Sequence, residues 1–177
     1  MRGYIAVALV LVTAVLVNCT QGNTEPLSRA KLANASYQIE WGGDGVVQLS
    51  DGEYHNVEEG VRVTLTDLIA IGDLNGDGVD DAAALLVVSP GGSGVFRYAA
   101  VAINRDGEPD NVACLMIGDR VDVKVFRIEN SEIVAEMIAH GPDDPMCCPT
   151  QSVVRRYRLE GDVLRMVDRK TRETHPE

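Results

Sequence analysis

The chain has 177 residues, with 16 Lys and Arg against 27 Asp and Glu, and a formal net charge of −11. Such an acidic balance argues against nucleic acid and anionic membrane surfaces as partners, because both are bound through basic patches. After residue 17 no segment approaches the ~20 apolar residues that a membrane-spanning helix needs, which argues against a polytopic helical membrane protein.

The N-terminus has the pattern of a secretory signal. Arg2 precedes residues 5–17, which are apolar except for Thr13. A charged start followed by a short apolar stretch is typical of a signal peptide and is too short for a spanning helix. Residues 1–18 are therefore predicted to be a signal peptide, and the protein to be exported.

The end of this apolar stretch resembles the bacterial lipobox. Leu16, Val17 and Cys19 match that pattern, whereas Asn18 is larger than the residue usual before the cysteine. The resemblance implies that Cys19 carries a lipid and that the protein is attached through it to the membrane of the bacterial cell envelope. The alternatives are ordinary cleavage near residues 20–22, which gives a soluble secreted protein, and an N-terminal segment that is retained as an anchor.

Residues 19–30 are polar, contain Gly22 and Pro26, and are predicted to be a flexible tether. A short helix capped by Ser28 could begin at its end. The β domain is expected over residues 31–167. Residues 168–177 are charged, have no apolar face and are expected to fray.

Alternating apolar and polar residues dominate the domain. Turn signals such as Asp51-Gly52 and Asp106-Gly107 separate the predicted strands. One stretch, residues 82–88, is continuously apolar and is predicted to be a strand buried on both faces. The expected strands cover residues 37–41, 46–49, 61–65, 82–88, 95–103, 112–117, 121–128, 133–139, 153–159 and 163–167. This spacing predicts a single all-β domain, an antiparallel meander forming a sandwich or a barrel.

The loop after residue 72 has the spacing of a calcium-binding loop. It offers side-chain oxygens at positions 1, 3, 5 and 9, a glycine (Gly78) at position 6 and a backbone carbonyl at position 7. The predicted ligands of a structural Ca²⁺ are Asp73, Asn75, Asp77, Val79 and Asp81. An EF-hand is excluded because Ala84 stands where its bidentate Glu belongs. An acidic turn without an ion is the alternative, since Asp and Gly favour turns in any case.

This loop is similar to the calcium loops of FG-GAP and integrin-type β-propeller repeats, which share the order Asp-x-Asn-x-Asp-Gly-x-x-Asp. The resemblance implies ion binding between two strands. It does not imply a propeller, because the chain has one copy and a propeller needs several blades.

The cysteines allow more than one pairing. If Cys19 carries a lipid, Cys114, Cys147 and Cys148 remain, and the expected bridge joins Cys114 to Cys147 or Cys148. A bond between the neighbours Cys147 and Cys148 is the other possibility.

Two catalytic or metal-binding interpretations of residues 140–150 stay open. His140 could act as base for Cys147 or Cys148 in a small secreted hydrolase, or the three residues could bind zinc. We favour a rigid Pro-rich connection, because closeness in sequence is weak evidence for a catalytic pair.

Residues 143–150, with the hairpin that contains Tyr157, resemble the C-terminal part of bacterial exported lipoproteins of the LppP/LprE type, whose biochemical role is unknown. The resemblance implies a location in the cell envelope. The sequence thus predicts a non-catalytic envelope lipoprotein, a binding or structural module for an unknown protein or envelope ligand, with the hydrolase as the alternative. A pocket between the sheets would argue against a purely structural role.

Overall fold

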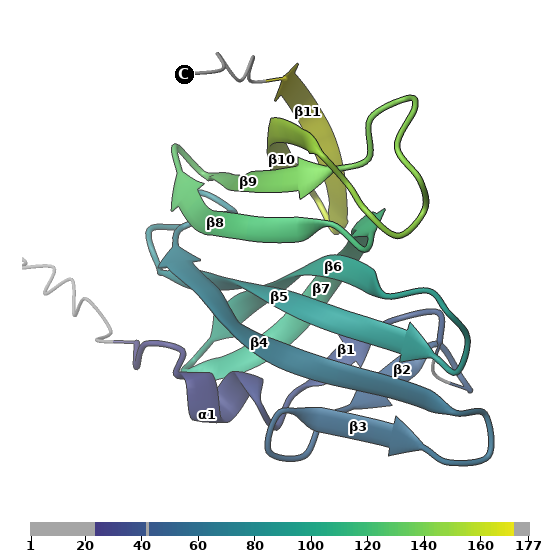
Figure 1. Ribbon diagram of the computed structural model, residues 1–177. Helices are drawn as coiled ribbons and strands as arrows, with labels where there is room; N and C mark the ends of the chain where they lie inside the picture. The colour runs from purple at the N-terminus through teal and green to yellow at the C-terminus, as the bar shows by residue number, and fades with distance from the viewer. Residues whose placement is uncertain (1–23, 42, 172–177) are drawn as a thin grey trace, which may run out of the picture.

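The computed structural model describes residues 24–41 and 43–171, which form three antiparallel sheets and one short helix (Figure 1). The predicted signal peptide and Cys19 lie outside the described residues. The helix is α1 (Arg29–Leu32), and the smallest sheet pairs β1 (Ser36–Gln38) with β2 (Val46–Gln48). The five-stranded sheet contains, in spatial order, β3 (Glu53–Asn56), β4 (Val61–Gly72), β5 (Asp81–Pro90), β6 (Phe96–Arg105) and β7 (Glu108–Asp119). The four-stranded sheet contains β8 (Asp122–Glu129), β9 (Glu132–Ala139), β10 (Gln151–Glu160) and β11 (Val163–Thr171), also in order of sequence.

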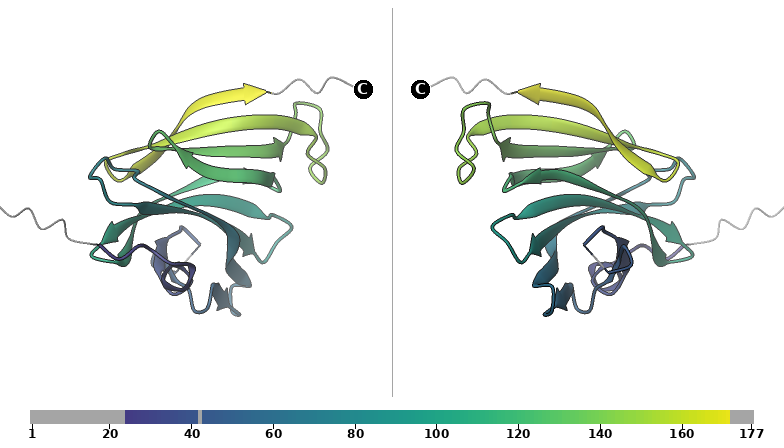
Figure 2. Two further views of the ribbon diagram at one scale, coloured as in Figure 1. Left: turned by 90° about the vertical axis from the view of Figure 1, so that its left-hand side faces the viewer. Right: turned by 90° about the vertical axis from the view of Figure 1, so that its right-hand side faces the viewer.

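The five-stranded sheet is the middle layer of the molecule. The four-stranded sheet packs on one of its faces, and α1 with the β1–β2 hairpin covers the other (Figures 1 and 2). The all-β antiparallel meander is therefore confirmed. Of the two predicted architectures it is the sandwich, since the sheets do not close into a barrel.

Strand β5 explains why the layers need a continuous apolar segment. Ala82, Ala84 and Leu86 face the helix and the β1–β2 hairpin, whereas Ala83 and Leu85 face the four-stranded sheet. Successive side chains of a strand point to opposite faces, so a strand in the middle layer must be apolar at every position. The predicted strand buried on both faces is confirmed.

The turn from β6 to β7 follows from its two residues. Asp106 and Gly107 have φ angles of 55° and 90°, and Arg105 pairs with Glu108 across them. Two residues with positive φ make a tight turn whose twist matches that of the strands it joins. The Asp-Gly signal at this position thus fixes the register of the hairpin.

Both ends of the domain differ from the expected boundaries. Leu27 is buried in the core and the Asn104 side chain donates to the Glu25 carbonyl, so the described part of the expected tether packs against the domain. At the other end β11 continues to Thr171, opposite Val153, where a charged tail was expected from residue 168. Backbone pairing needs no apolar side chain, which explains why residues 168–171 extend the strand.

The helix agrees with its predicted cap. The Ser28 side chain accepts a hydrogen bond from the Lys31 backbone N–H at 3.3 Å, and α1 ends after one turn. Within residues 24–41 and 43–171, no helix is long and apolar enough to cross a membrane.

Candidate functional sites

The acidic loop lies between β4 and β5 and is organised by its own side chains. Asp73 accepts hydrogen bonds from the backbone N–H groups of Gly76 (2.6 Å) and Gly78 (3.0 Å). Asn75 accepts from the N–H of Asp77 at 2.9 Å, and Asp77 accepts from that of Val79 at 2.8 Å. Asp and Asn form such local turns readily, so the sequence itself bends this loop into a coil of short turns.

Asp81 differs from the other predicted ligands because it is completely buried. One carboxylate oxygen accepts the N–H of Leu74 and the other accepts the N–H of Asn104, both at 3.0 Å. Asp81 therefore fastens the loop to β6. Its two oxygens already satisfy buried backbone donors, so the exposed part of the loop supplies the oxygens most accessible to an ion.

The charges of the loop act on one another. The amide of Asn75, the N–H of Val79 and the charge of Arg105 lower the pKa of Asp77. Burial raises the pKa of Asp81, and the nearby charge of Asp77 adds to this, against the opposing effect of the backbone donors. Because the charge of Asp77 disfavours the charged form of Asp81, a cation near these two carboxylates would favour it.

The oxygen atoms of this loop are of the types that a hard cation prefers as ligands. Asp73, Asn75 and Asp77 present carboxylate and amide oxygens, and Val79 adds a backbone carbonyl. Leu74 is buried between these residues and anchors the loop in the core. Within the described residues no group of three or more His, Cys, Asp or Glu side chains is placed to hold a metal ion, so an ion here depends on the amide and carbonyl oxygens as well.

The loop from His140 to Thr150 contains the second set of predicted site residues. The sulfur atoms of Cys147 and Cys148 are in close contact, as in a vicinal disulfide, and Cys114 is free. The expected bridge from Cys114 to this loop is therefore not formed. Cys114 packs instead against the core on the helix side of the middle sheet, and its thiol contacts the Asn111 side chain.

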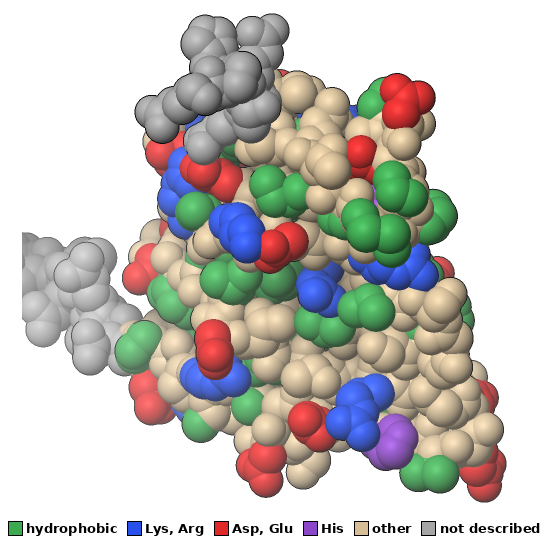
Figure 3. Space-filling model, in the orientation of Figure 1, with side chains coloured by type: hydrophobic (Ala, Val, Ile, Leu, Met, Phe, Trp, Pro, Cys, Tyr) green, Lys and Arg blue, Asp and Glu red, His purple; other side chains and the backbone are tan. Residues whose placement is uncertain are grey.

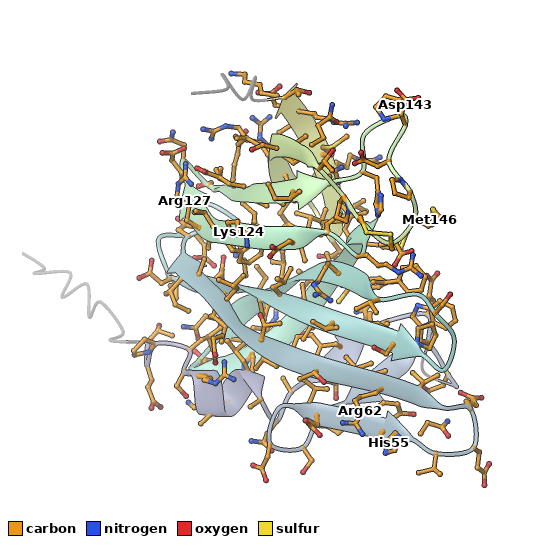
Figure 4. The ribbon with its side chains drawn as sticks, in the orientation of Figure 1. His55, Arg62, Lys124, Arg127, Asp143 and Met146 are labelled. Atoms are coloured by element: carbon orange, nitrogen blue, oxygen red, sulfur yellow. A yellow bond between two sulfur atoms is a disulfide. The ribbon has the colours of Figure 1, made fainter. Side chains whose placement is uncertain are left out.

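This loop is built around Asp144 and Arg120. Asp144 accepts hydrogen bonds from the backbone N–H of Gly141 and from the N–H and hydroxyl of Thr150, at 2.7–2.8 Å. The Arg120 guanidinium donates to the Met146 carbonyl and, on its other side, to the Ser93 carbonyl. Figure 4 labels Asp143 and Met146 in this loop, and Figure 3 shows hydrophobic side chains gathered over it. Hydrogen bonds to Asp144 thus hold the Pro-rich segment at both ends, and Arg120 holds its middle.

The geometry brings none of the catalytic pairs together. Both ring nitrogens of His140 are buried and have no hydrogen-bond partner among the described residues, so neither contacts the sulfur of Cys147 or Cys148. A general base must lie within hydrogen-bond reach of its nucleophile. The predicted pairing of His140 with a cysteine is not formed here.

A third site was not recognised in the sequence. Residues 115–117 of β7, Arg155 and Tyr157 of β10, and residues 164–166 of β11 line a groove between the two large sheets, with a volume of about 470 Å³. Arg155 and Tyr157 belong to the hairpin noted for its lipoprotein resemblance, but nothing in their spacing shows that they face a groove. A pocket between the sheets is the feature that argues against a purely structural role.

No family model, no curated protein and no solved structure matches the chain.

Proposed function

We propose that the chain is a non-catalytic lipoprotein of the bacterial cell envelope, whose β-sandwich is a binding module stabilised by one Ca²⁺ in the β4–β5 loop. Asp73, Asn75, Asp77 and the Val79 carbonyl would hold the ion, and Asp81 would fix the loop that carries them. When bound, the ion neutralises carboxylates that otherwise repel one another.

The observation that carries the calcium proposal is that different residues of this loop anchor it and present oxygens at the surface. Asp81 and Leu74 are buried and hold the loop to the core, whereas Asp73, Asn75 and Asp77 remain at the surface. A simple turn between two strands needs far fewer oxygen-bearing side chains than this loop provides. The lipid and the envelope location are supported by the sequence around Cys19 and by the resemblance of residues 143–150.

Calcium titration of the full purified chain tests the ion site. Calcium at about 100 times its Kd stabilises a folded state by about 2.7 kcal/mol. A domain of this size gains about 2–4 °C in Tm per kcal/mol, so we expect a rise of about 5–10 °C. Asp77→Asn should abolish the rise, because Asn keeps an acceptor for the Val79 N–H and loses the charge.

Asp106→Asn is the matched control, since Asp106 lies in another Asp-Gly turn and is not a predicted ligand. It should leave the calcium response intact. A wild-type Tm that does not move with millimolar calcium would refute the ion site.

The lipid is tested by expression in a bacterium that processes lipoproteins. The wild-type protein should fractionate with membranes and carry the mass of a diacylglyceryl group on Cys19. Cys19→Ser should be recovered without it. A wild-type protein that is soluble and begins near residues 20–22 would contradict the anchor.

A further inference from the structure

The groove between the sheets exists because the sandwich is open along one side. On the closed side β4 approaches β8, and a Cβ atom on Gly72 would lie 3.0 Å from Ile128 Cγ2. On the open side β7 and β11 are the edge strands of their sheets and share no ladder. The Arg155 guanidinium crosses this gap and donates to the Ile117 carbonyl.

Two polar groups of the groove are buried without a partner. Tyr157 is 2% exposed and its hydroxyl has no acceptor within the described part of the chain, although the Arg155 side chain lies beside it. The Nε of Arg155 is likewise buried and unpartnered. A buried donor without an acceptor is destabilising, so such groups point to a ligand that supplies one.

These two groups lie on the same side of β10, because side chains two residues apart in a strand share a face. Burial raises the pKa of Tyr157, and the charge and side-chain contact of Arg155, with the charge of Arg169, oppose that rise. The hydroxyl therefore remains a donor at neutral pH. Arg155 forms no ion pair with a carboxylate of the described residues, although the whole chain carries an excess of acidic groups.

The groove has apolar side chains beside its polar ones, among them Leu115, Leu164 and Met166. Met166 is 52% exposed. Met166 lies directly opposite Tyr157 in the β10–β11 ladder, so the two side chains are neighbours. Methionine side chains are flexible and adapt to apolar ligands of different shape.

We propose that this groove binds a small anionic amphiphile, with a carboxylate at the Arg155 and Tyr157 donors and an unbranched apolar chain along Leu115 and Met166. The volume lies within the usual range for small-molecule sites. The net charge of the protein repels anions at long range, so recognition depends on the local guanidinium. This proposal deepens the binding part of the proposed function and rests on it, but not on the calcium loop.

The test titrates the full chain, without added calcium, with dodecanoate below its micelle concentration, because calcium precipitates long-chain carboxylates. Dodecan-1-ol and dodecyltrimethylammonium are the matched uncharged and cationic probes. We expect dodecanoate to bind at least about tenfold more tightly than either, as expected for a charge-assisted hydrogen bond. Tyr157→Phe should weaken dodecanoate about tenfold, and Arg155→Gln should remove the preference over dodecan-1-ol.

Arg158→Gln is the control variant. Arg158 follows Tyr157 in β10, lies on the face opposite to Tyr157 and pairs with Glu132. It should bind dodecanoate like the wild type. Tyr157→Phe keeps the ring that packs in the core, so it decides the matter if Arg155→Gln does not fold.

Methionine methyl NMR locates the ligand. The signal of Met166 should shift on addition of dodecanoate, and that of Met146, in the loop after β9, should not. Equal binding of the three probes, unchanged affinity in Tyr157→Phe, or shifts confined to other residues would overturn the proposal. So would the absence of dodecanoate binding in a chain that still responds to calcium, and that result would leave the ion site standing.

Discussion

The carboxylate of Asp81 accepts a hydrogen bond from the backbone N–H of Asn104, 23 residues further along the chain. Its other oxygen accepts from Leu74, at the start of the acidic loop. One buried side chain thus joins the loop between β4 and β5 to the end of β6. The Asn104 side chain extends the connection, because it donates to the Glu25 and Asp80 carbonyls and accepts from Gly107.

Asp81→Ala should be strongly destabilising, because it leaves the buried N–H groups of Leu74 and Asn104 without acceptors. Each such loss costs about 1–3 kcal/mol, so we expect a decrease in unfolding free energy of about 2–6 kcal/mol. Urea denaturation without calcium measures it. Asp80→Ala is the control, since Asp80 is exposed and contributes its backbone carbonyl alone. If the two variants unfold at the same urea concentration, Asp81 does not anchor the loop.

The contact between the two large sheets at Gly72 gives a second prediction. A Cβ atom there would lie 3.0 Å from Ile128 Cγ2 and 3.3 Å from Ile128 Cβ. Gly72→Ala should therefore destabilise the protein by about 1–3 kcal/mol through overpacking. Gly92→Ala should be close to neutral, because a Cβ on Gly92 meets no atom within 4 Å.

Adding Ile128→Leu to Gly72→Ala should recover part of the loss, since leucine is not branched at Cβ and lacks the Cγ2 atom that the new Cβ would meet. Denaturation midpoints of the three variants decide this. A double variant no more stable than Gly72→Ala would show that the strain lies elsewhere.

The cysteines predict a fixed order of reactivity toward iodoacetamide. The close contact of Cys147 and Cys148 means that neither should react in the native protein before reduction, and both are exposed and should react after it. Burial raises the pKa of Cys114 to about 12, so little thiolate is present at pH 8 and Cys114 should react slowest. Intact-protein mass spectrometry with peptide mapping follows the three sites. Fast labelling of Cys147 or Cys148 without reductant would contradict the vicinal pair and revive the hydrolase alternative.

The strand order was predictable from the sequence because, in both large sheets, each strand pairs with the strand that follows it in the chain. Each hairpin is closed by a local signal such as Asp106-Gly107, and alternation or a continuous apolar stretch indicates which face is buried. Residues 24–30 and 168–171 differ from the expected tether and tail for one reason. The Glu25 carbonyl and the end of β11 gain their contacts from Asn104 and Val153, which are distant in sequence.

The sites were predictable only where their residues are consecutive. The acidic loop could be recognised from one segment, but the role of Asp81 depends on Asn104, and the groove requires β7 to lie beside β10 and β11. The predicted cysteine pairing was wrong for a similar reason, since it required Cys114 to face the loop from His140 to Thr150. In the structure it faces the opposite side of the middle sheet, with the core that α1 covers.

Asp144 provides a pH-dependent test of the His140–Thr150 loop. The N–H of Gly141, the hydroxyl and N–H of Thr150, and the charge of His140 hold its pKa below the ordinary value of 3.8. A carboxyl with a lowered folded-state pKa contributes stability that is fully present above its unfolded-state pKa and is lost as the pH falls through the folded value. The loop should therefore stay closed at neutral pH and loosen below about pH 4, where the unfolded chain already binds the proton.

NMR titration of the Asp144 side chain measures this pKa directly, and amide exchange of Gly141 and Thr150 reports on the loop. Thr150→Val removes one donor to Asp144 and should bring the pKa back toward its ordinary value. Asp143→Asn, a neutral change next to it, should keep most of the depression. If Asp144 titrates at its ordinary value in the wild type, its hydrogen bonds do not hold the loop, and the rigidity of this segment must come from Arg120 and the prolines.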